Sequence, residues 1–382
     1  MTANAVEVAA AGDISCPADS TQQNAVKPGE PEPAPGAAKC QGKRVAEMIE
    51  GQNPDVALAL GDLIQGQTSY AHAYNDFGLA WGGLGARIAA TVGNHDYHRN
   101  ANGVLTASGY FRYWESQKVP VWSYGKPNLG WSSWNTGDWH MVNLNSNCNV
   151  ADCTFTGPQL RWLVKDLQAN RRSGKTQCTL AYFHHPLFST GVPRGRSGDE
   201  SLVANLWEIL YRYRTDLVLT GHQHFYERYF PQNPSGRRDD TGITQIITGT
   251  GGASTFRPDG KDGNVATNSA FSIRRLGATF LSLGNGEYET RFRDMLGEEH
   301  DVAEPAKCLK PGAGHNERVP RVKRYRAHMD RMAALDRRVK KLERRLKELK
   351  KDDAPDRKIE DIKDTLRAVT VTRERVRITR LY

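Results

Sequence analysis

A short motif containing Asp, Asn or His recurs five times in this 382-residue sequence, each time directly after an apolar run. The motifs are Gly12-Asp13, Gly61-Asp62, Gly93-Asn94-His95-Asp96, His184-His185-Pro186 and Gly221-His222-Gln223-His224. The apolar runs span 6–11, 56–60, 88–92, 179–183 and 217–220, and each has the length of a strand. Because the carboxyl ends of strands in an open α/β sheet converge on one crevice, we expect these polar side chains to form a single site.

The residue types in these motifs indicate a metal site. Carboxylate, imidazole and amide oxygen together are the ligands of a borderline or hard divalent metal rather than of a thiolate site. The candidate ligands are Asp13, Asp62, Asn94, His184, His222 and His224. These are too many for one tetrahedral ion, but they suit two ions that share a carboxylate. Two such ions stabilise the attacking and leaving oxygens of an in-line displacement, which favours hydrolysis of a phosphate ester.

The order of the expected elements favours an α/β (α+β) fold. Further strands are expected at 122–124, 132–144, 245–248, 279–283 and 288–293, the last of which closes the domain, and helices at 43–50, 158–170 and 202–213. Strands alternate with helices first and strand pairs follow, so mixed sheets covered by helices are expected.

The motifs, in this order, resemble the calcineurin-like metallophosphoesterases, and within them the purple acid phosphatase-like branch of the bacterial secreted type. The resemblance runs from about Val6 to Arg293 and is strengthened by LNSNC at 144–148, FHHPLFS at 183–189, GHQHFYER at 221–228 and a GTGG turn at 249–252. It implies a four-layer sandwich of two mixed β-sheets flanked by helices, and a metal-dependent phosphatase with a dinuclear centre.

The resemblance also implies a role for each motif. Asp13 and His224 would bind the first metal, Asn94, His184 and His222 would bind the second, and Asp62 would bridge the two. A water or hydroxide between the metals would be the nucleophile. His95 would contact substrate or protonate the leaving group, and Asp96 would orient His95. His185 is expected to point away from the site, because side chains alternate along a strand.

The first metal site departs from the family pattern at two positions. The purple enzymes have a Tyr three residues after the bridging Asp, as an iron(III) ligand, and this position holds Gln65. Other members have a His two residues after the first Asp, and this position holds Ser15. Gln65 is therefore a further candidate ligand, and Tyr70 or His72 are alternatives. We expect two divalent ions, zinc, manganese or iron, rather than an iron(III) charge-transfer site.

These features favour a dinuclear metal-dependent hydrolase of phosphate monoesters, acting on a small or polymeric substrate. One alternative is a phosphodiesterase or nuclease that uses the same metal pair. Another is a degenerate, non-catalytic adaptor that assembles through its C-terminal segment. Substrate choice is expected to depend on loops at 100–108 and 191–200, and His98 and Arg99 are candidate phosphate contacts.

The six cysteines indicate an oxidising compartment. Proximity in the sequence suggests the pairs Cys16–Cys40 and Cys148–Cys153, which leaves Cys178 with Cys308. Six buried thiols are the alternative. The N-terminal residues have none of the regions of a signal peptide, yet the cysteines favour an exported protein, extracellular or periplasmic. No run of 18 apolar residues is present, so no transmembrane segment is expected.

The C-terminal segment has a different composition from the rest of the chain. Residues 317–382 hold 23 Lys and Arg and 12 Asp and Glu, whereas residues 1–316 hold 29 and 31. The expected organisation is a catalytic domain at 1–310, a linker at 311–320 and a basic amphipathic helical hairpin or coiled coil at 321–382, for which no family resemblance is found.

Heptad spacing underlies this expectation. Apolar residues recur every three or four positions from 325 to 349, the segment 352–355 breaks the pattern, and a second amphipathic run follows at 359–369. Two such runs joined by a short turn predict an antiparallel helical hairpin. The 325–349 seam is a candidate interface for a homo-oligomer. The basic residues are typical of an exposed helix face, and nucleic-acid binding is the less favoured interpretation.

Overall fold

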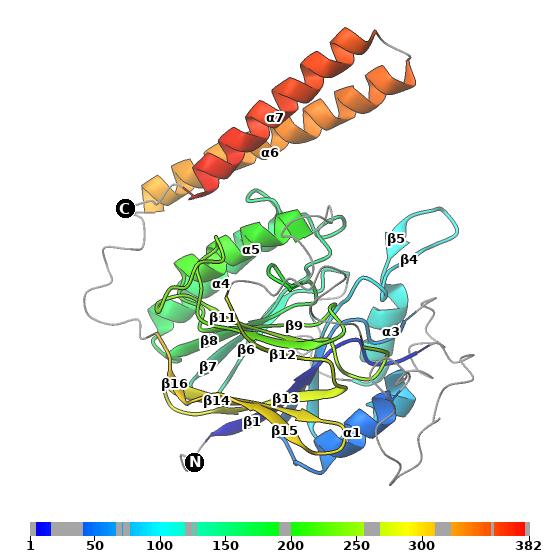
Figure 1. The fold of residues 1–382 in the computed structure, drawn as a ribbon, viewed down its shortest axis with the longest axis vertical. Coiled ribbons are helices and arrows are strands. Elements are labelled where there is room, and N and C mark those ends of the chain that lie inside the picture. Colours follow the sequence, from blue (N-terminus) through cyan, green and yellow to red (C-terminus); the bar gives the residue numbers. More distant parts are fainter. Residues whose placement is uncertain are drawn as a thin grey trace. The chain divides into compact units, whose positions relative to one another are not determined.

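A computed structural model describes residues 5–16, 41–65, 71, 77–118, 125, 128–190, 200–255, 268–309, 322–352 and 355–378. The chain divides into two compact units (Figure 1). The first contains Met1–Ala151 and Lys165–Pro311, and the second contains Asp152–Val164 and Gly312–Tyr382. The expected linker at 311–320 lies outside the described residues, so the domain boundaries given above stay a prediction.

The first sheet has the strand order β15-β14-β13-β1-β2-β3, with β16 paired to β14. Its strands are β1 (Val6–Ala11), β2 (Val56–Leu60), β3 (Arg87–Thr91), β13 (Gly277–Leu283), β14 (Glu287–Asp294), β15 (Glu299–Val302) and β16 (Ala306–Lys307). Strands β1, β2 and β3 are parallel, and β13 is antiparallel to β1. The sheet is therefore mixed, and its three parallel strands end at the same edge.

The second sheet has the strand order β12-β10-β11-β9-β8-β7-β6. Its strands are β6 (Ser132–Thr136), β7 (Trp139–Asn143), β8 (Cys178–Tyr182), β9 (Leu217–Thr220), β10 (Tyr226–Tyr229), β11 (Thr244–Thr248) and β12 (Ser269–Ile273). Strands β7, β8, β9 and β11 are parallel, and the flanking strands are antiparallel to their neighbours. The two sheets pack face to face (Figure 1).

Strand β1 shows how the side-chain alternation builds two cores. Val8 and Ala10 face the second sheet and pack with Leu180 and Leu219. Ala9 and Ala11 point to the other face of the first sheet, in a core that includes residues of α1 (Gly42–Glu50) and α3 (Ser108–Ser116). Helix α4 spans Pro158–Ser173, and α5 (Glu200–Arg212) covers the outer face of the second sheet (Figure 1). The expected sandwich of mixed sheets flanked by helices is confirmed.

The strands and helices expected from periodicity are present within three residues of the expected bounds, with two exceptions. The single strand expected at 132–144 is instead a hairpin of β6 and β7, because the chain turns at residues 137–138. The strand expected at 122–124 lies outside the described residues. The expectation that 288–293 closes the domain was wrong, because β15 and β16 follow. The expected loop at 100–108 contains part of a ribbon, with β4 (His98–Arg99) antiparallel to β5 (Leu105–Thr106). Strands of two to four residues are too short to produce a readable alternation, so these elements have no clear sequence signal.

All five cysteines that the structure describes are disulfide-bonded. The expected Cys178–Cys308 disulfide is present, with 5.5 Å between the two Cα atoms. Cys16, Cys148 and Cys153 are also in disulfides. Cys40 lies outside the described residues, so the other two pairings stay predictions. The alternative of buried thiols is excluded for the five described cysteines.

A buried carboxylate lies beside the Cys178–Cys308 disulfide. Asp216, directly before β9, accepts the backbone N–H of Thr179 at 2.8 Å and that of Leu309 at 2.6 Å. These two donors are the residues that follow the two cysteines. Burial raises the pKa of Asp216 to about 7. The C-terminal end of the first unit is thus attached to β8 by one disulfide bond and one shared carboxylate.

The C-terminal segment forms the expected helical hairpin of α6 (Val322–Lys351) and α7 (Asp356–Ile378), which run antiparallel (Figure 1). The seam residues of α6, among them Val339 and Leu346, are half-buried, and Arg373 of α7 donates to Asp336 of α6 at 2.6 Å. No helix in the described part of the chain is long and apolar enough to cross a membrane.

Replacing Asp216 with Ala is expected to lower the free energy of unfolding by about 2–4 kcal/mol, because two buried N–H groups lose their acceptor. The folded-state pKa of about 7 lies above the unfolded value of 3.8. The stability that Asp216 contributes is therefore fully present below 3.8 and is lost as the pH rises toward 7. Urea unfolding without reductant measures the free energy of unfolding of the parent protein and of Asp216→Ala. The difference between these two free energies should narrow as the pH rises from about 4 to about 8.

The exposed Asp240→Ala variant is the matched control and should follow the parent protein at every pH. If the difference in free energy of unfolding between the parent protein and Asp216→Ala widened with rising pH, the raised pKa of Asp216 in the folded state would be contradicted.

Candidate metal centre

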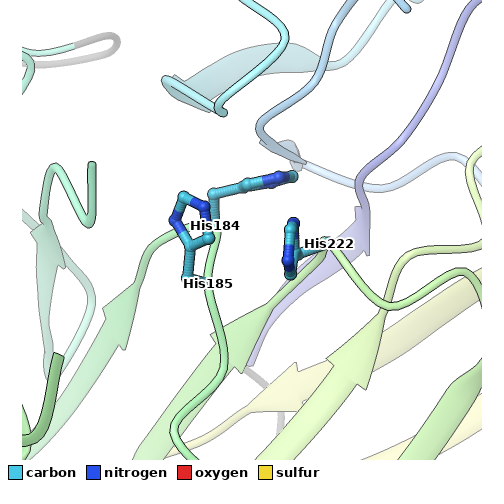
Figure 2. A group of neighbouring side chains, drawn as sticks. All are labelled: His184, His185 and His222. Atoms are coloured by element: carbon cyan, nitrogen blue, oxygen red, sulfur yellow. The ribbon is translucent and has the colours of Figure 1, made fainter. Parts of the chain in front are cut away.

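The candidate ligands lie at the carboxyl ends of parallel strands in both sheets. Asp13 and Asp62 follow β1 and β2 of the first sheet, and Asn94 follows β3 by three residues. His184 and His222 each follow by two residues the neighbouring strands β8 and β9 of the second sheet, as Figure 2 shows. The face-to-face packing of the sheets therefore brings ligands from five strand ends to one place.

The backbone turns sharply where the chain leaves these strands. Asp13, Asp62 and His222 have φ values of 58°, 48° and 69°, in the left-handed region that residues other than glycine rarely adopt. The turn at Asp13 is held by backbone hydrogen bonds to Gly61 and, through Ile14, to Asp62, each 3.0 Å long. Strained backbone of this kind persists only where surrounding contacts enforce it, and it is frequent at functional sites.

Glycines let two of the turns come close to the carboxylates. A Cβ atom on Gly93 would lie 2.1 Å from both the backbone nitrogen and Oδ1 of Asp62. A Cβ atom on Gly221 would lie 2.8 Å from Oδ2 of Asp13. No side chain fits at either position without moving the carboxylate. The glycines in these motifs are therefore steric requirements of the site.

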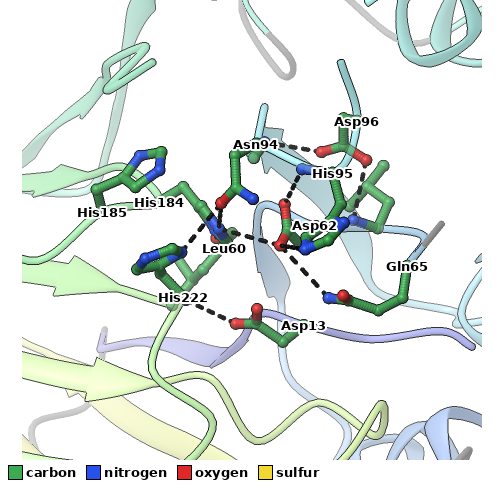
Figure 3. A network of polar contacts seen from close by, with 12 residues as sticks. Asp13, Leu60, Asp62, Gln65, Asn94, His95, Asp96, His184, His185 and His222 are labelled. Atoms are coloured by element: carbon green, nitrogen blue, oxygen red, sulfur yellow. Dashed lines mark hydrogen bonds and ion pairs between the residues drawn. The ribbon is translucent and has the colours of Figure 1, made fainter. Parts of the chain in front are cut away.

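Asp62 is at the centre of a polar network (Figure 3). Its Oδ1 accepts the backbone N–H of His95 at 2.8 Å, and its Oδ2 lies 3.3 Å from Nε2 of His184. Burial by itself would raise the pKa of Asp62, but the charges of His184 and His95 hold it well below its usual range. Asp62 is therefore an anion inside the protein.

The geometry around His184 fits a bound cation. Its Nδ1 lies 2.8 Å from the carbonyl oxygen of Leu60, which can only accept, so Nδ1 carries a hydrogen and Nε2 presents its lone pair in the neutral ring. That Nε2 lies 3.0 Å from Oδ1 of Asn94 and 3.3 Å from the Asp62 carboxylate. Three acceptors thus meet where a positive ion would satisfy all of them.

Two further observations support the same fit. Oδ1 of Asp13 is buried and accepts no hydrogen bond, although Nε2 of His224 lies 3.1 Å away. Oδ1 of Asn94 lies 3.0 Å from Nδ1 of His222 as well as from His184. Ligand atoms of Asp13, Asp62 and His184 lie within 4.8 Å of one another. The donor set therefore suits divalent metal ions, and all six expected ligands belong to one cluster.

His185 does not point away from the site, so that expectation was wrong. Its ring centroid lies 4.5 Å from that of His222 and 4.9 Å from that of His184 (Figure 2). The Oγ of Ser146 accepts the His185 backbone N–H at 2.9 Å and lies 2.8 Å from Nδ1 of the same residue. Strand β8 ends at Tyr182, so the alternation of a strand no longer applies at His185.

His95 and Asp96 differ in their environment. The His95 side chain is 47% exposed, and its Nε2 lies 4.0 Å from Oδ2 of Asp62, so this imidazole borders the buried cluster and reaches solvent. Asp96 is buried, and its carboxylate accepts the backbone N–H groups of Leu63 at 3.1 Å and Gly93 at 2.7 Å. Burial and the Asp62 charge raise the pKa of Asp96. Asp96 therefore connects the loop after β2 to the loop after β3 through these two hydrogen bonds. The expected contact with the His95 ring is not formed.

Of the remaining candidate residues, Gln65 lies at the cluster and Arg99 does not contact it. The amide nitrogen of Gln65 donates to Oδ2 of Asp62 across 3.4 Å, so this side chain does reach the cluster. Arg99 donates to the carbonyl of Gly103 within its own ribbon. Tyr70, His72 and the loop at 191–199 lie outside the described residues.

Residues that hold the ligands were missed by sequence reasoning. Ser254 lies 2.7 Å from Nδ1 of His224, and Ser146 supports His185. Gly251 and Ala253, at the GTGG turn, donate backbone N–H groups to Gly12 and Asp13. Ser146 lies in the LNSNC segment, which was read only as a mark of resemblance. Ser254 has no comparable signal, because its role depends on where the turn places it.

The chain is similar in sequence to known phosphoesterases. A family model described as calcineurin-like phosphoesterase matches residues 8–226. Purple acid phosphatase 23 of Arabidopsis thaliana is 30% identical over 155 residues, which cover 39% of this chain and 32% of that protein. The acid phosphatase of Aspergillus ficuum is 32% identical over 184 residues, which cover 44% of this chain and 29% of that protein. The chain thus spans about a third of the length of these curated relatives.

Solved structures show the same fold. The purple acid phosphatase PPD1 of yellow lupin superposes with a TM-score of 0.57 at 17% identity, covering 78% of this chain and 53% of that chain. GAP50 of Plasmodium, described as the anchor in the inner membrane complex, has a TM-score of 0.52 at 13% identity. The superposition covers 81% of this chain and 90% of that chain. At these identities the likeness concerns the fold alone. Because the family model matches more than half of the chain, from β1 to the first residue of β10, the chain belongs to the calcineurin-like phosphoesterase family.

Proposed function

We propose that this chain is a dinuclear, metal-dependent hydrolase of phosphate monoesters. The observation that carries the proposal is a cluster of carboxylates, imidazoles and an amide oxygen, bordered by the exposed imidazole of His95. Asp13, Asp62, His184 and His224 of this cluster are buried, and Asn94 and His222 are half-buried. The curated relatives named above are phosphatases. Two zinc, manganese or iron ions bound here would neutralise phosphate charge and lower the pKa of a bound water.

The contacts support a division of the ligands between two ions. Asp13 and His224 are paired on one side, and Asn94 lies between His184 and His222 on the other. Asp62 would bridge them, and Gln65 remains a further candidate ligand. The ligand orientations are set by neighbours outside the cluster: the Leu60 carbonyl fixes the His184 ring, and Ser254 contacts the His224 ring.

His95 is placed to act on the substrate. Its backbone N–H is held by Asp62, while its ring extends from the cluster toward solvent. A ring in this position can donate a hydrogen bond to a phosphate oxygen or a proton to the leaving alkoxide. Asp96 would act as a positioning residue, because it fixes the Gly93 end of the loop that carries His95.

The disulfides support a further proposal about the compartment. Reduced glutathione and thioredoxin keep thiols reduced in most cytosols, so a chain whose described cysteines are all bonded is suited to an exported location.

Replacing Asp62 with Ala is expected to remove at least one metal ion per chain, because the bridging carboxylate is lost. Turnover of p-nitrophenyl phosphate should fall by more than the roughly 10- to 100-fold typical of an outer-shell partner. Mass spectrometry of metal content and steady-state kinetics on the same sample check both effects, with Asp240→Ala as the control. Unchanged turnover, or a parent enzyme that prefers bis-p-nitrophenyl phosphate, would contradict a monoesterase with this centre.

Replacing His95 with Ala is expected to lower kcat by about 10²- to 10⁴-fold while both metals stay bound. If His95 protonates the leaving group, the loss should be larger for phenyl phosphate than for p-nitrophenyl phosphate, whose leaving group needs no proton. The kinetics of the two substrates should be compared on protein of verified metal content. Equal, small losses for both substrates would rule out a catalytic role.

Replacing His185 with Ala is expected to weaken metal binding by about 10- to 100-fold, because His222 loses the ring that packs against it. Chelator titration measures the affinity directly. Ser146→Ala should have a similar effect, and the double variant should lose less than the sum of the two single variants, because the side chains act through each other. Additive losses would show that Ser146 does not act through His185.

A further inference from the structure

The two helices of the C-terminal hairpin differ strongly in charge. Helix α6 contains thirteen Lys and Arg against four Asp and Glu, whereas α7 contains seven against five. The positive charge of the C-terminal segment is therefore concentrated on one helix. The positions of these charges on α6 determine what the helix can bind.

Several Lys and Arg residues of α6 lie on the side opposite its apolar seam. Arg337, Lys341 and Arg344 are spaced i, i+4 and i+7, which places them on one helical face, and all three are exposed. Lys351 continues this face one heptad further along. The seam residues Leu335, Val339, Leu342, Leu346 and Leu349 are half-buried on the opposite side. We call the surface formed by Arg337, Lys341, Arg344 and Lys351 the basic face.

Acidic neighbours neutralise α7 but not the basic face. On α7, Lys363 pairs with Glu360 at 2.8 Å and Arg367 pairs with Asp364 at 2.9 Å. Arg373 pairs with Asp336 of α6 at 2.6 Å. Glu348 lies on the same helical face, between Arg344 and Lys351, but its carboxylate pairs with Arg345 at 3.3 Å.

The basic face lacks such pairs. Arg337, Lys341 and Arg344 form no ion pair with any residue that the structure describes. Like charges at i and i+4, such as Arg337 and Lys341, destabilise a helix by a few tenths of a kcal/mol. The basic face therefore opposes the stability of α6, and an anionic partner would remove that repulsion.

We propose that the basic face binds duplex nucleic acid through its phosphates. Duplex DNA carries one negative charge per about 1.7 Å of its axis, so basic residues on it release many counterions. Residues 337–351 of α6 extend over roughly 21 Å, at about 1.5 Å per residue, which is enough to follow several phosphates. Phosphate contacts carry no base information, so the binding is independent of sequence.

The composition of the hairpin favours a duplex over other polyanions. Single-strand binding depends on aromatic side chains that stack on bases, and Tyr325 is the single aromatic residue in the two helices. Insertion into an anionic membrane requires an apolar face opposite the basic one. The apolar seam of α6 is half-buried in the hairpin and is therefore not the exposed apolar face that such insertion needs.

The test uses the full chain and a fluorescent DNA duplex of about 20 base pairs, with anisotropy measured from about 50 to 200 mM salt. We expect binding that weakens with salt and is equal for two unrelated sequences. The variant R337Q/K341Q/R344Q should reduce the slope of log affinity against log salt by about 2.7, from about 0.9 for each lost phosphate contact. Its turnover of p-nitrophenyl phosphate should equal that of the parent.

The variant R357Q/K358Q/R367Q, with the same charge removed from α7, is the matched control and should keep the parent slope. If R337Q/K341Q/R344Q loses helix by circular dichroism, R337K/R344K replaces it and should keep duplex affinity, because phosphate contacts depend on charge. No duplex binding at low salt, equal effects of the α6 and α7 triple variants, or tighter binding to single strands or phosphatidylserine vesicles would each overturn the proposal.

Discussion

The buried carboxylate of Asp62 is the contact on which the rest of the site depends. It lies at the end of β2, in a left-handed turn that Gly93 permits by approaching to where a Cβ would clash. It meets an imidazole of the second sheet and holds the loop of His95. A carboxylate that is ionised inside a protein is stable only if opposite charge surrounds it. The packing of the two sheets supplies that charge in the form of His184.

Metal binding explains an arrangement that would otherwise be unfavourable. Asp13, Asp62 and Asn94 bring oxygen atoms toward imidazole nitrogens whose lone pairs face them. Without a cation, the chain has to protonate a histidine to avoid repulsion between acceptors, and the raised pKa of His184 reflects this. The left-handed turns add strain at the same positions. Binding energy from metal ions is the natural compensation for both effects.

Sequence reasoning placed the candidate ligands in one cluster because five of the six lie within three residues of the carboxyl end of a regular strand, and His224 lies in the same short loop as His222. Position relative to a strand end depends on the neighbouring sequence alone, so the places of Asp13, Asp62 and His222 could be predicted from the apolar runs that precede them. Contacts made beyond a strand end were not readable. The direction of His185 and the backbone partners of Asp96 depend on how separate loops pack, and a single sequence does not encode that packing as a periodic pattern.

The Cys178–Cys308 disulfide has a mechanical consequence. Strands β8 and β9 carry candidate metal ligands beyond their carboxyl ends, while the disulfide and Asp216 attach the chain at their amino ends. Tension applied to the C-terminal segment would reach the second sheet through a covalent bond at the first residue of β8. The loops that carry the candidate ligands lie at the opposite ends of these two strands, so the covalent attachment and the candidate site are separated by the full length of β8.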